Sequence, residues 1–186
     1  MREQPFLPRR RSVRLPGFDY SERHSYFVTI CAQGKRPIFG RIVGSNEVSL
    51  SGIGRIVQAC WKEIPSHFPN ADLATFVVMP EHLHGILILR ERVPEGRSEA
   101  KVPRRARRAV PLQKHLGDFA APTIGSIPTI VGAFKSAVSK RVSGNRSKPN
   151  SIWQRGYYEH VIWNEDEFAK VCEYIRLNPA RRLCRL

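Results

Sequence analysis

Two histidines separated by one apolar residue carry the clearest chemical signal in the sequence. His82 and His84 flank Leu83 and open an alternating apolar run that ends at Leu89. In an extended strand, residues two apart point to the same face of the sheet. The two imidazoles would therefore converge, with Leu83 turned to the other face, and two convergent nitrogens can hold one divalent cation. The pair is a weak signal by itself, because most such pairs are polar side chains on an accessible sheet face.

A tyrosine and an asparagine near the C-terminus could complete such a site. Tyr174 and Asn178 are four residues apart in a segment with helical periodicity, so they share one helix face. Asn178 can offer an amide oxygen as a third metal ligand. The hydroxyl of Tyr174 can attack phosphorus once it loses its proton, which a nearby cation favours. The product would be a phosphotyrosine linkage and a free hydroxyl on the other side of the broken phosphodiester, and rejoining would need no ATP.

The charge of the chain points to a polyanionic partner. The 186 residues include 31 Lys and Arg against 16 Asp and Glu, for a formal net charge of +15. Nucleic acid is the first candidate for such a surface, and a basic surface kept for solubility is the alternative. No apolar stretch approaches the roughly 20 residues of a membrane-spanning helix, so we expect no membrane association.

The cysteines and the N-terminus indicate a cytoplasmic location. No two of the four cysteines have metal-ligand spacing, and no apolar signal segment follows Met1. We therefore expect a cytoplasmic protein with reduced thiols. The cysteines are Cys31, Cys60, Cys172 and Cys184.

Hydrophobic periodicity predicts an α+β fold with the element order β-α-β-β-α-β-α. Two βαβ halves and a final helix suggest a ferredoxin-like sandwich, in which an antiparallel sheet carries helices on one face and a C-terminal helix bears Tyr174. Ser51 and Asn164 are the expected helix N-caps, with Glu167 in a capping box, and Pro179 is expected to end the last helix. The predicted strands cover 25–32, 71–79, 82–89 and, irregularly, 152–162; a short hairpin lies within 38–50; the helices cover 53–64, 126–142 and 165–178.

The chain divides into a basic arm and one interrupted domain. Residues 1–24 are basic and broken by prolines and a glycine, and residues 25–186 form the domain. Residues 91–122 are basic and rich in proline. We interpret them as an insertion, because a loop of this length is uncommon inside a compact domain. Basic side chains in the arm and the domain are candidates for DNA contact: Arg10, Arg11, Arg14, Lys135, Lys140 and Arg155.

Several motifs together resemble a known family, the REP-associated tyrosine transposases within the single-tyrosine HUH transposases. Residues 79–84, Met-Pro-Glu-His-Leu-His, look like the HUH motif of histidine, hydrophobic residue and histidine. Residues 174–179, Tyr-Ile-Arg-Leu-Asn-Pro, are similar to the tyrosine helix of the same group. The resemblance covers nearly the whole chain, and further matching segments are 10–20, 26–31, 134–138 and 152–162.

The resemblance implies a specific activity. His82, His84 and Asn178 would bind Mg²⁺ or Mn²⁺, and Tyr174 would be the nucleophile that forms a 5′-phosphotyrosine. Ligand softness alone would favour Mn²⁺ or Zn²⁺ over Mg²⁺ at two imidazoles. The implied function is a transposase or endonuclease that cleaves and rejoins single-stranded DNA at imperfect palindromes that form hairpins. Such DNA is recognised by stacking and backbone contacts.

Two departures and three alternatives accompany this interpretation. Trp163 stands where the family often has an arginine, and the 91–122 insertion is long, so substrate choice and full activity are open. A DNA-binding protein of the same fold that acts on palindromic repeats without chemistry is the main alternative. An RNA-binding module would need Tyr26 and Phe27 exposed on the sheet. A zinc hydrolase would need a His-Glu-x-x-His helix, which this sequence lacks.

If Tyr174 is not the nucleophile, Tyr157 and Tyr158 are the next candidates. The DNA sequence, the cleavage position, a monomeric or homodimeric state, and a tyrosine acting in its own or a neighbouring subunit stay open.

Overall fold

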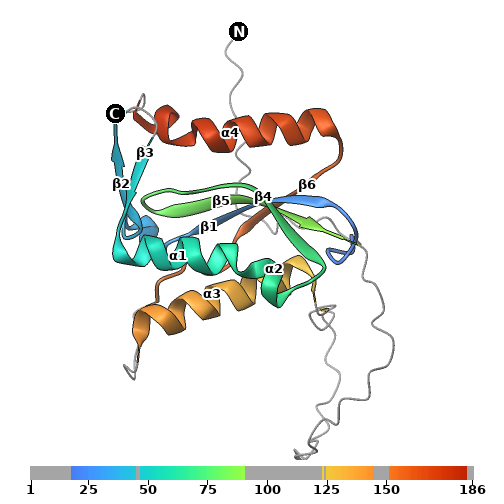
Figure 1. The fold of residues 1–186 in the computed structure, drawn as a ribbon, viewed down its shortest axis with the longest axis horizontal. Coiled ribbons are helices and arrows are strands. Elements are labelled where there is room, and N and C mark those ends of the chain that lie inside the picture. Colours follow the sequence, from blue (N-terminus) through green and yellow to red (C-terminus); the bar gives the residue numbers. More distant parts are fainter. Residues whose placement is uncertain (1–17, 45–46, 91–122, 124, 145–150, 184–186) are drawn as a thin grey trace, which may run out of the picture.

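The protein is a three-layer structure with a sheet in the middle. The computed structural model describes residues 18–44, 47–90, 123, 125–144 and 151–183, and for 181–183 only the backbone. Figure 1 shows α1, α2 and α3 on one face of a four-stranded sheet and α4 on the other. The sheet strands are β1 (Ser25–Cys31), β4 (Ala71–Val78), β5 (His82–Leu89) and β6 (Tyr158–Ile162). The helices are α1 (Gly52–Lys62), α2 (Ile64–His67), α3 (Ile127–Ser143) and α4 (Glu165–Leu183), and the 3-10 turn η1 covers Gln33–Lys35.

The strand order confirms the predicted α+β, ferredoxin-like class. The order is β4-β5-β1-β6, and every neighbouring pair is antiparallel. Each central strand thus belongs to one βαβ half, β1-α1-β4 or β5-α3-β6, and the two halves interleave as in the split βαβ arrangement. The helix beyond the two halves, α4, covers the face that α1 and α3 leave open.

Alternation along the central strands decides which residues reach α4. On β1, Tyr26, Val28 and Ile30 are buried in the larger core cluster, which includes side chains of α1 and α3. Phe27 lies on the opposite face, in a smaller cluster with residues of α4. The same period of two holds on β5, where Leu83 and Leu87 belong to the larger core and Ile86 to the smaller one. His82 and His84 therefore face α4.

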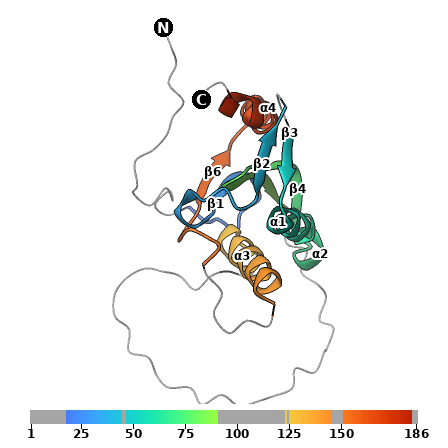
Figure 2. The ribbon, with the colours of Figure 1, turned by 90° about the vertical axis from the view of Figure 1, so that its left-hand side faces the viewer.

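The predicted hairpin within 38–50 is confirmed and stands beside the sheet. It consists of β2 (Gly40–Val43) and β3 (Glu47–Leu50), which form a separate antiparallel pair. Figure 2 shows this pair rising from α1 toward α4, and β3 contacts both helices. The hydroxyl of Ser51 accepts a hydrogen bond from the N–H of Gly54, so Ser51 is the N-cap of α1 as predicted.

Two predicted boundaries are wrong. Pro179 does not end α4, which continues to Leu183 with the proline inside the helix. A proline lacks the N–H that would bond to the carbonyl of Ile175, which normally disfavours a helix interior. Pro179 is nevertheless buried, and its packing favours the continuous helix in this context. The predicted strand over 152–162 is regular only in β6, and Trp153 contributes one isolated bridge to Ala32.

The N-terminus of α4 is capped nearly as predicted. The side chain of Asn164 accepts a hydrogen bond from the N–H of Glu167 at 2.9 Å. The carboxylate of Glu167 in turn accepts from the N–H of Trp163 at 2.9 Å, one residue before the N-cap that a capping box would use. Both bonds fix where α4 leaves β6, and this sets the position of Tyr174 further along the helix.

The packed part of the domain begins before Ser25. Tyr20 is buried in the larger core cluster, and the ring of Phe18 packs edge-on against it at 5.0 Å between centroids. Residues 1–17 of the predicted arm, with Arg10, Arg11 and Arg14, lie outside the described residues. The 91–122 insertion also lies outside them.

The described residues give two findings on thiols and membranes. Cys31, Cys60 and Cys172 are free thiols, and Cys184 lies outside the described part of the chain. None of the helices in this part is both long and apolar enough to cross a bilayer.

Replacement of Gly85, next to His84, by a larger residue is expected to destabilise the fold. A Cβ atom there would lie 2.5 Å from Cζ2 of Trp61, whose side chain is fully buried and cannot move aside freely. We expect Gly85→Ala to lower the free energy of unfolding by about 1–3 kcal/mol, the usual cost of overpacking a core. Urea unfolding followed by circular dichroism measures this change.

Gly132→Ala is the matched control for Gly85→Ala. Gly132 lies on the exposed face of α3, and a Cβ atom added to it would have no neighbour within 4 Å. This substitution should raise the free energy of unfolding by up to about 1 kcal/mol, because alanine favours helices more than glycine does. Equal effects of the two substitutions would contradict the close packing of Trp61 on β5.

Candidate active site

The structure brings the histidine pair and the tyrosine together within one chain. The ring centroids of His82 and His84 on β5 are 4.4 Å apart. The ring of Tyr174 on α4 approaches His84 edge-on, with 5.4 Å between centroids. The convergence follows from the alternation on β5, which aims both imidazoles at α4, and from the packing of α4 on the same sheet face.

Asn178 joins this cluster one helical turn beyond Tyr174. It is buried, at 9% exposure, and its side chain lies close enough to His82 to oppose the lowering of that residue's pKa. The four residues expected to do the chemistry or to hold a metal thus lie in one place. Within the described residues, no three His, Cys, Asp or Glu side chains are grouped as a metal site. A cation here would therefore depend on the amide oxygen of Asn178 as its third protein ligand.

Each imidazole has an oxygen beside its Nδ1 atom. The Nδ1 atom of His84 forms a hydrogen bond of 2.8 Å with the hydroxyl of Thr29 on β1, which lies directly opposite in the sheet register. The Nδ1 atom of His82 lies 3.3 Å from a carboxylate oxygen of Glu81. The Nε2 atom of His82 is buried and has no hydrogen-bond partner among the described residues. This arrangement is typical of metal-binding histidines, whose second nitrogen is held by a hydroxyl or carboxylate.

Burial keeps both imidazoles neutral near pH 7. Desolvation lowers the pKa of His82 to about 4, with a further contribution from the positive charge of Lys35, while Asn178 opposes the change. Desolvation also lowers the pKa of His84 well below its ordinary value, and the neighbouring His82 adds to this. A neutral imidazole has a lone pair ready for a cation, so no proton has to be displaced before binding.

Phe27 supports the rings of His84 and Tyr174. It stacks on His84 at 5.3 Å between centroids with an interplanar angle of 28°, and it meets Tyr174 edge-on at 6.0 Å. Such offset and edge contacts between aromatic rings are favourable. The phenol of Tyr174 is therefore held against the histidine pair by two ring contacts while its side chain stays only half-buried.

The other tyrosines differ in their access to this site. Tyr158 on β6 lies opposite Thr29 on the same sheet face, and burial, followed by the charges of Glu167 and Tyr174, raises its pKa. Tyr26 is fully buried on the other face, where desolvation raises its pKa strongly. An RNA-binding module would need Tyr26 exposed, so the described sheet does not offer the surface that this alternative requires.

The basic residues proposed for DNA contact are scattered. Lys140 is exposed on α3, and Arg155 is exposed in the segment before β6. The ammonium of Lys135 donates hydrogen bonds to the carbonyl oxygens of Gln154 and Gly156, at 2.8 and 2.9 Å, so it fastens that segment to α3. Contact of Lys135, Lys140 and Arg155 with DNA stays a prediction. Trp163, at the position where the family often has an arginine, is 57% exposed and packs edge-on against Phe18 and His24.

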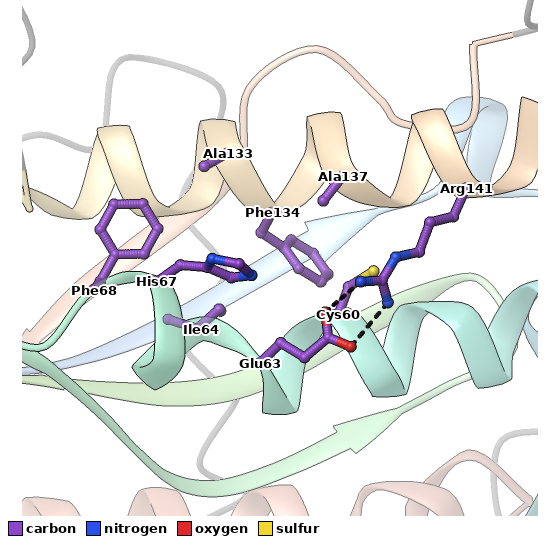
Figure 3. Close-up of a pocket in the computed structure, with 9 residues that line it drawn as sticks. All are labelled: Cys60, Glu63, Ile64, His67, Phe68, Ala133, Phe134, Ala137 and Arg141. Atoms are coloured by element: carbon purple, nitrogen blue, oxygen red, sulfur yellow. Dashed lines mark hydrogen bonds and ion pairs between the residues drawn. The ribbon is translucent and has the colours of Figure 1, made fainter.

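A pocket of about 280 Å³ lies on the opposite side of the sheet. Figure 3 shows it between α1 and α2 on one side and α3 on the other, with the ring of Phe134 at its centre. The ion pair between Glu63 and Arg141 closes one end, and Phe68 lies at the other. The sheet separates this pocket from His82 and His84, so it is not part of the candidate active site.

Sequence reasoning missed three residues that contact the histidines. Thr29 and Phe27 are on a different strand, and only the register of β1 against β5 places them beside His84. Glu81 precedes His82 directly, and its acidic type next to an imidazole was a usable signal. Residue spacing within one strand cannot show cross-strand partners, because they depend on which strands pair and in what register.

A solved structure shares this fold. The structure of a REP-associated tyrosine transposase bound to a REP hairpin matches 86% of this chain and 68% of that chain, with a TM-score of 0.54. The sequences are 17% identical, so the similarity concerns the fold alone. The predicted assignment to the REP-associated tyrosine transposases is thereby confirmed at the level of the fold.

One sequence relative establishes the family of the chain. A protein of Haemophilus influenzae (strain ATCC 51907 / DSM 11121 / KW20 / Rd), described as uncharacterized, is 38% identical over 170 residues. The aligned part covers 91% of this chain and 88% of that protein. The chain belongs to the same family as this Haemophilus protein. No protein-family model matches the chain.

Proposed function

We propose that the protein is a metal-dependent, single-tyrosine transposase that cleaves and rejoins single-stranded DNA at hairpin-forming repeats. One observation carries the proposal: the phenol of Tyr174, the imidazoles of His82 and His84, and the amide of Asn178 converge in one chain. The fold shared with a REP-associated tyrosine transposase supports it.

The residues of the site fit a divalent cation. The Nε2 atom of His82 is buried and has no hydrogen-bond partner among the described residues, so its lone pair is available to a cation. His82 and His84 would bind through Nε2, and Asn178 would supply an oxygen, which leaves positions for phosphate and water. Bound Mg²⁺ or Mn²⁺ would neutralise phosphodiester charge and hold the phosphate in position.

The proposed reaction is a transesterification at phosphorus. The hydroxyl oxygen of Tyr174 loses its proton to solvent or a nearby base and forms a bond to phosphorus. The bond between phosphorus and the 3′ oxygen breaks, and that oxygen takes up a proton to become a free 3′ hydroxyl. The strand beyond the break stays attached through its 5′ phosphate to Tyr174. Reversal of the same step with another 3′ hydroxyl rejoins DNA without an added energy source.

The tyrosine would act within its own subunit. The contact between Tyr174 and His84 is made inside one chain, at 5.4 Å between ring centroids. A single chain therefore carries every proposed ligand and the nucleophile. This arrangement supports a catalytic unit of one subunit, in which a second copy is not needed to complete the site.

The proposed substrate follows from charge and from the structural neighbour. The net charge of +15 favours DNA. The neighbour of the same fold is bound to a REP hairpin, which suggests imperfect palindromes in single-stranded DNA as the substrate class. The reaction would take place in the cytoplasm. A protein that binds such hairpins without cleaving them is the alternative, and a covalent-adduct assay separates the two functions.

The assay uses the full chain and a set of imperfect palindromes that form hairpins, each with single-stranded flanks. A fluorescent label at the 3′ end stays with the strand that a 5′-phosphotyrosine retains. With Mn²⁺ we expect a labelled protein band that survives denaturing electrophoresis and disappears with a chelator. Hairpin binding without any such band, under conditions where the protein is folded, would favour the non-catalytic alternative.

Thr29 is expected to position His84 for metal binding. Thr29→Val keeps the branched shape of the side chain and removes the hydroxyl that bonds Nδ1 of His84. We expect Mn²⁺ affinity, measured by calorimetry or electron paramagnetic resonance, to fall about 10- to 100-fold, as for other partners that orient metal ligands.

Thr129→Val is the control for this loss. Its hydroxyl also donates a hydrogen bond, to the carbonyl of Thr123, but it lies at the start of α3 on the other side of the sheet. Its Mn²⁺ affinity should equal that of the wild type. A Thr29→Val protein with wild-type affinity would refute the positioning role.

A further inference from the structure

Lys35 has a backbone conformation that its residue type does not favour. Its φ is +53°, and it is the one non-glycine residue with positive φ in the described part of the chain. It follows Gly34, whose φ is +63°, so the two resemble the central residues of a type I′ turn. That turn favours glycine and asparagine, because a side chain in the left-handed region is strained. Strained residues of this kind tend to persist at functional sites.

The turn that carries Lys35 is fastened to the start of the histidine strand. The N–H of Ala32 donates to the carbonyl of Glu81 at 2.8 Å, and the N–H of Lys35 donates to the carbonyl of Ala32 at 3.0 Å. Cys31, just before the turn, is paired with His82 in the sheet register. The backbone therefore holds Lys35 at the end of the sheet where His82 begins β5.

The positive charge of Lys35 affects the pKa values of residues at this end of the sheet. It contributes to the low pKa of His82, and it opposes the effect of burial on the pKa of the Cys31 thiol. The side chain is exposed, and it takes part in none of the ion pairs between described residues. The backbone holds Lys35 where β5 begins, and its exposed ammonium takes part in no ion pair among the described residues, so it is available to an anion there.

We propose that Lys35 is a phosphate-binding residue, whose ammonium contacts a backbone phosphate of the DNA strand that enters the His82–His84–Tyr174 site. The inference rests on the proposed function and names a further contact for the same substrate. Lysine suits this role as a compact point charge with three donors. A phosphate contact would explain why the turn has a lysine at a position where glycine would be less strained.

The test separates backbone strain from DNA binding with Lys35→Gly. Glycine is preferred at positive φ, so this variant should melt at or above the wild-type temperature. Binding of a fluorescent hairpin with a single-stranded flank should weaken about 5-fold near 0.1 M salt. The slope of log affinity against log salt should fall by about 0.7, the value for one lost phosphate contact on a single strand. Lys35→Arg should restore both quantities.

Lys62→Ala is the matched control. Lys62 is an exposed lysine at the last position of α1, on the other face of the sheet, and its loss should leave the salt slope unchanged. Lys35→Asn serves as a second variant if Lys35→Gly does not fold, because asparagine also tolerates the left-handed region. Wild-type affinity and salt slope in both Lys35 variants would overturn the proposal.

Failure of the proposed Lys35 contact can be distinguished from failure of the proposed function. If the wild type forms no covalent adduct but Lys35→Gly still lowers the salt slope, the phosphate contact stands and the strand-transfer function fails. If adduct forms normally and the slope is unchanged in Lys35→Gly, the function stands and the role of Lys35 is wrong.

Discussion

Tyr174→Phe is expected to abolish the covalent protein–DNA adduct while the protein folds and binds hairpin DNA as before. The substitution removes only the hydroxyl, and the ring keeps its edge contacts with His84 and Phe27. Phenylalanine has no atom that can bond to phosphorus, so the labelled band on a denaturing gel should fall below detection. Fluorescence anisotropy with the same hairpin should give an affinity close to that of the wild type.

Tyr158→Phe is the control for this result. Tyr158 lies on the same sheet face, and its ring meets Phe27, which Tyr174 also contacts, so it is the competing nucleophile to test. This variant should still form the adduct. An adduct that persists in Tyr174→Phe and disappears in Tyr158→Phe would reassign the nucleophile to β6.

His84→Ala is expected to remove both metal binding and cleavage. It deletes one of the two proposed metal ligands, whose ring centroids are 4.4 Å apart, and leaves His82 as the single imidazole of the site. Mn²⁺ affinity should fall by more than about 100-fold, beyond the loss expected from a partner that only orients a ligand. Adduct formation should fall at least as far, because the phosphate loses the cation that neutralises and orients it. Calorimetry with Mn²⁺ and the denaturing gel measure the two effects separately.

His67→Ala is the matched histidine control. His67 is exposed at the end of α2, on the other side of the sheet, so Mn²⁺ affinity and adduct formation should equal those of the wild type. Hairpin affinity without metal should be unchanged in both histidine variants. If His84→Ala binds Mn²⁺ like the wild type, the cation site lies elsewhere and the proposed ligand set is wrong.

The direction of the histidine pair was predictable because it depends on one strand alone. A period of two along β5 places His82 and His84 on one face whatever the strand pairs with. The shared face of Tyr174 and Asn178 likewise depends on one helix. Their convergence required the further expectation that α4 packs over the histidine strand, and that expectation came from the family resemblance rather than from periodicity.

Contacts between strands were not predictable from spacing. Thr29 lies opposite His84 only because β1 pairs with β5 in one particular register. The position of Lys35 depends in the same way on a turn tied to Glu81 across the sheet. The helix stop at Pro179 was a local rule that tertiary packing overrides, since Pro179 is buried within a continuous α4. Residues 1–17 and 91–122, which carry many of the basic side chains, lie outside the described part.

Mapping the DNA-linked peptide tests the central claim most directly. The adduct is digested with nuclease and trypsin, and the peptide that retains a nucleotide is sequenced by mass spectrometry. Cleavage after Lys170 and Arg176 releases residues 171–176, in which Tyr174 is the sole tyrosine. The proposed chemistry predicts the nucleotide on this peptide, linked through a 5′ phosphate. A nucleotide on residues 156–170, which contain Tyr157 and Tyr158, would contradict it.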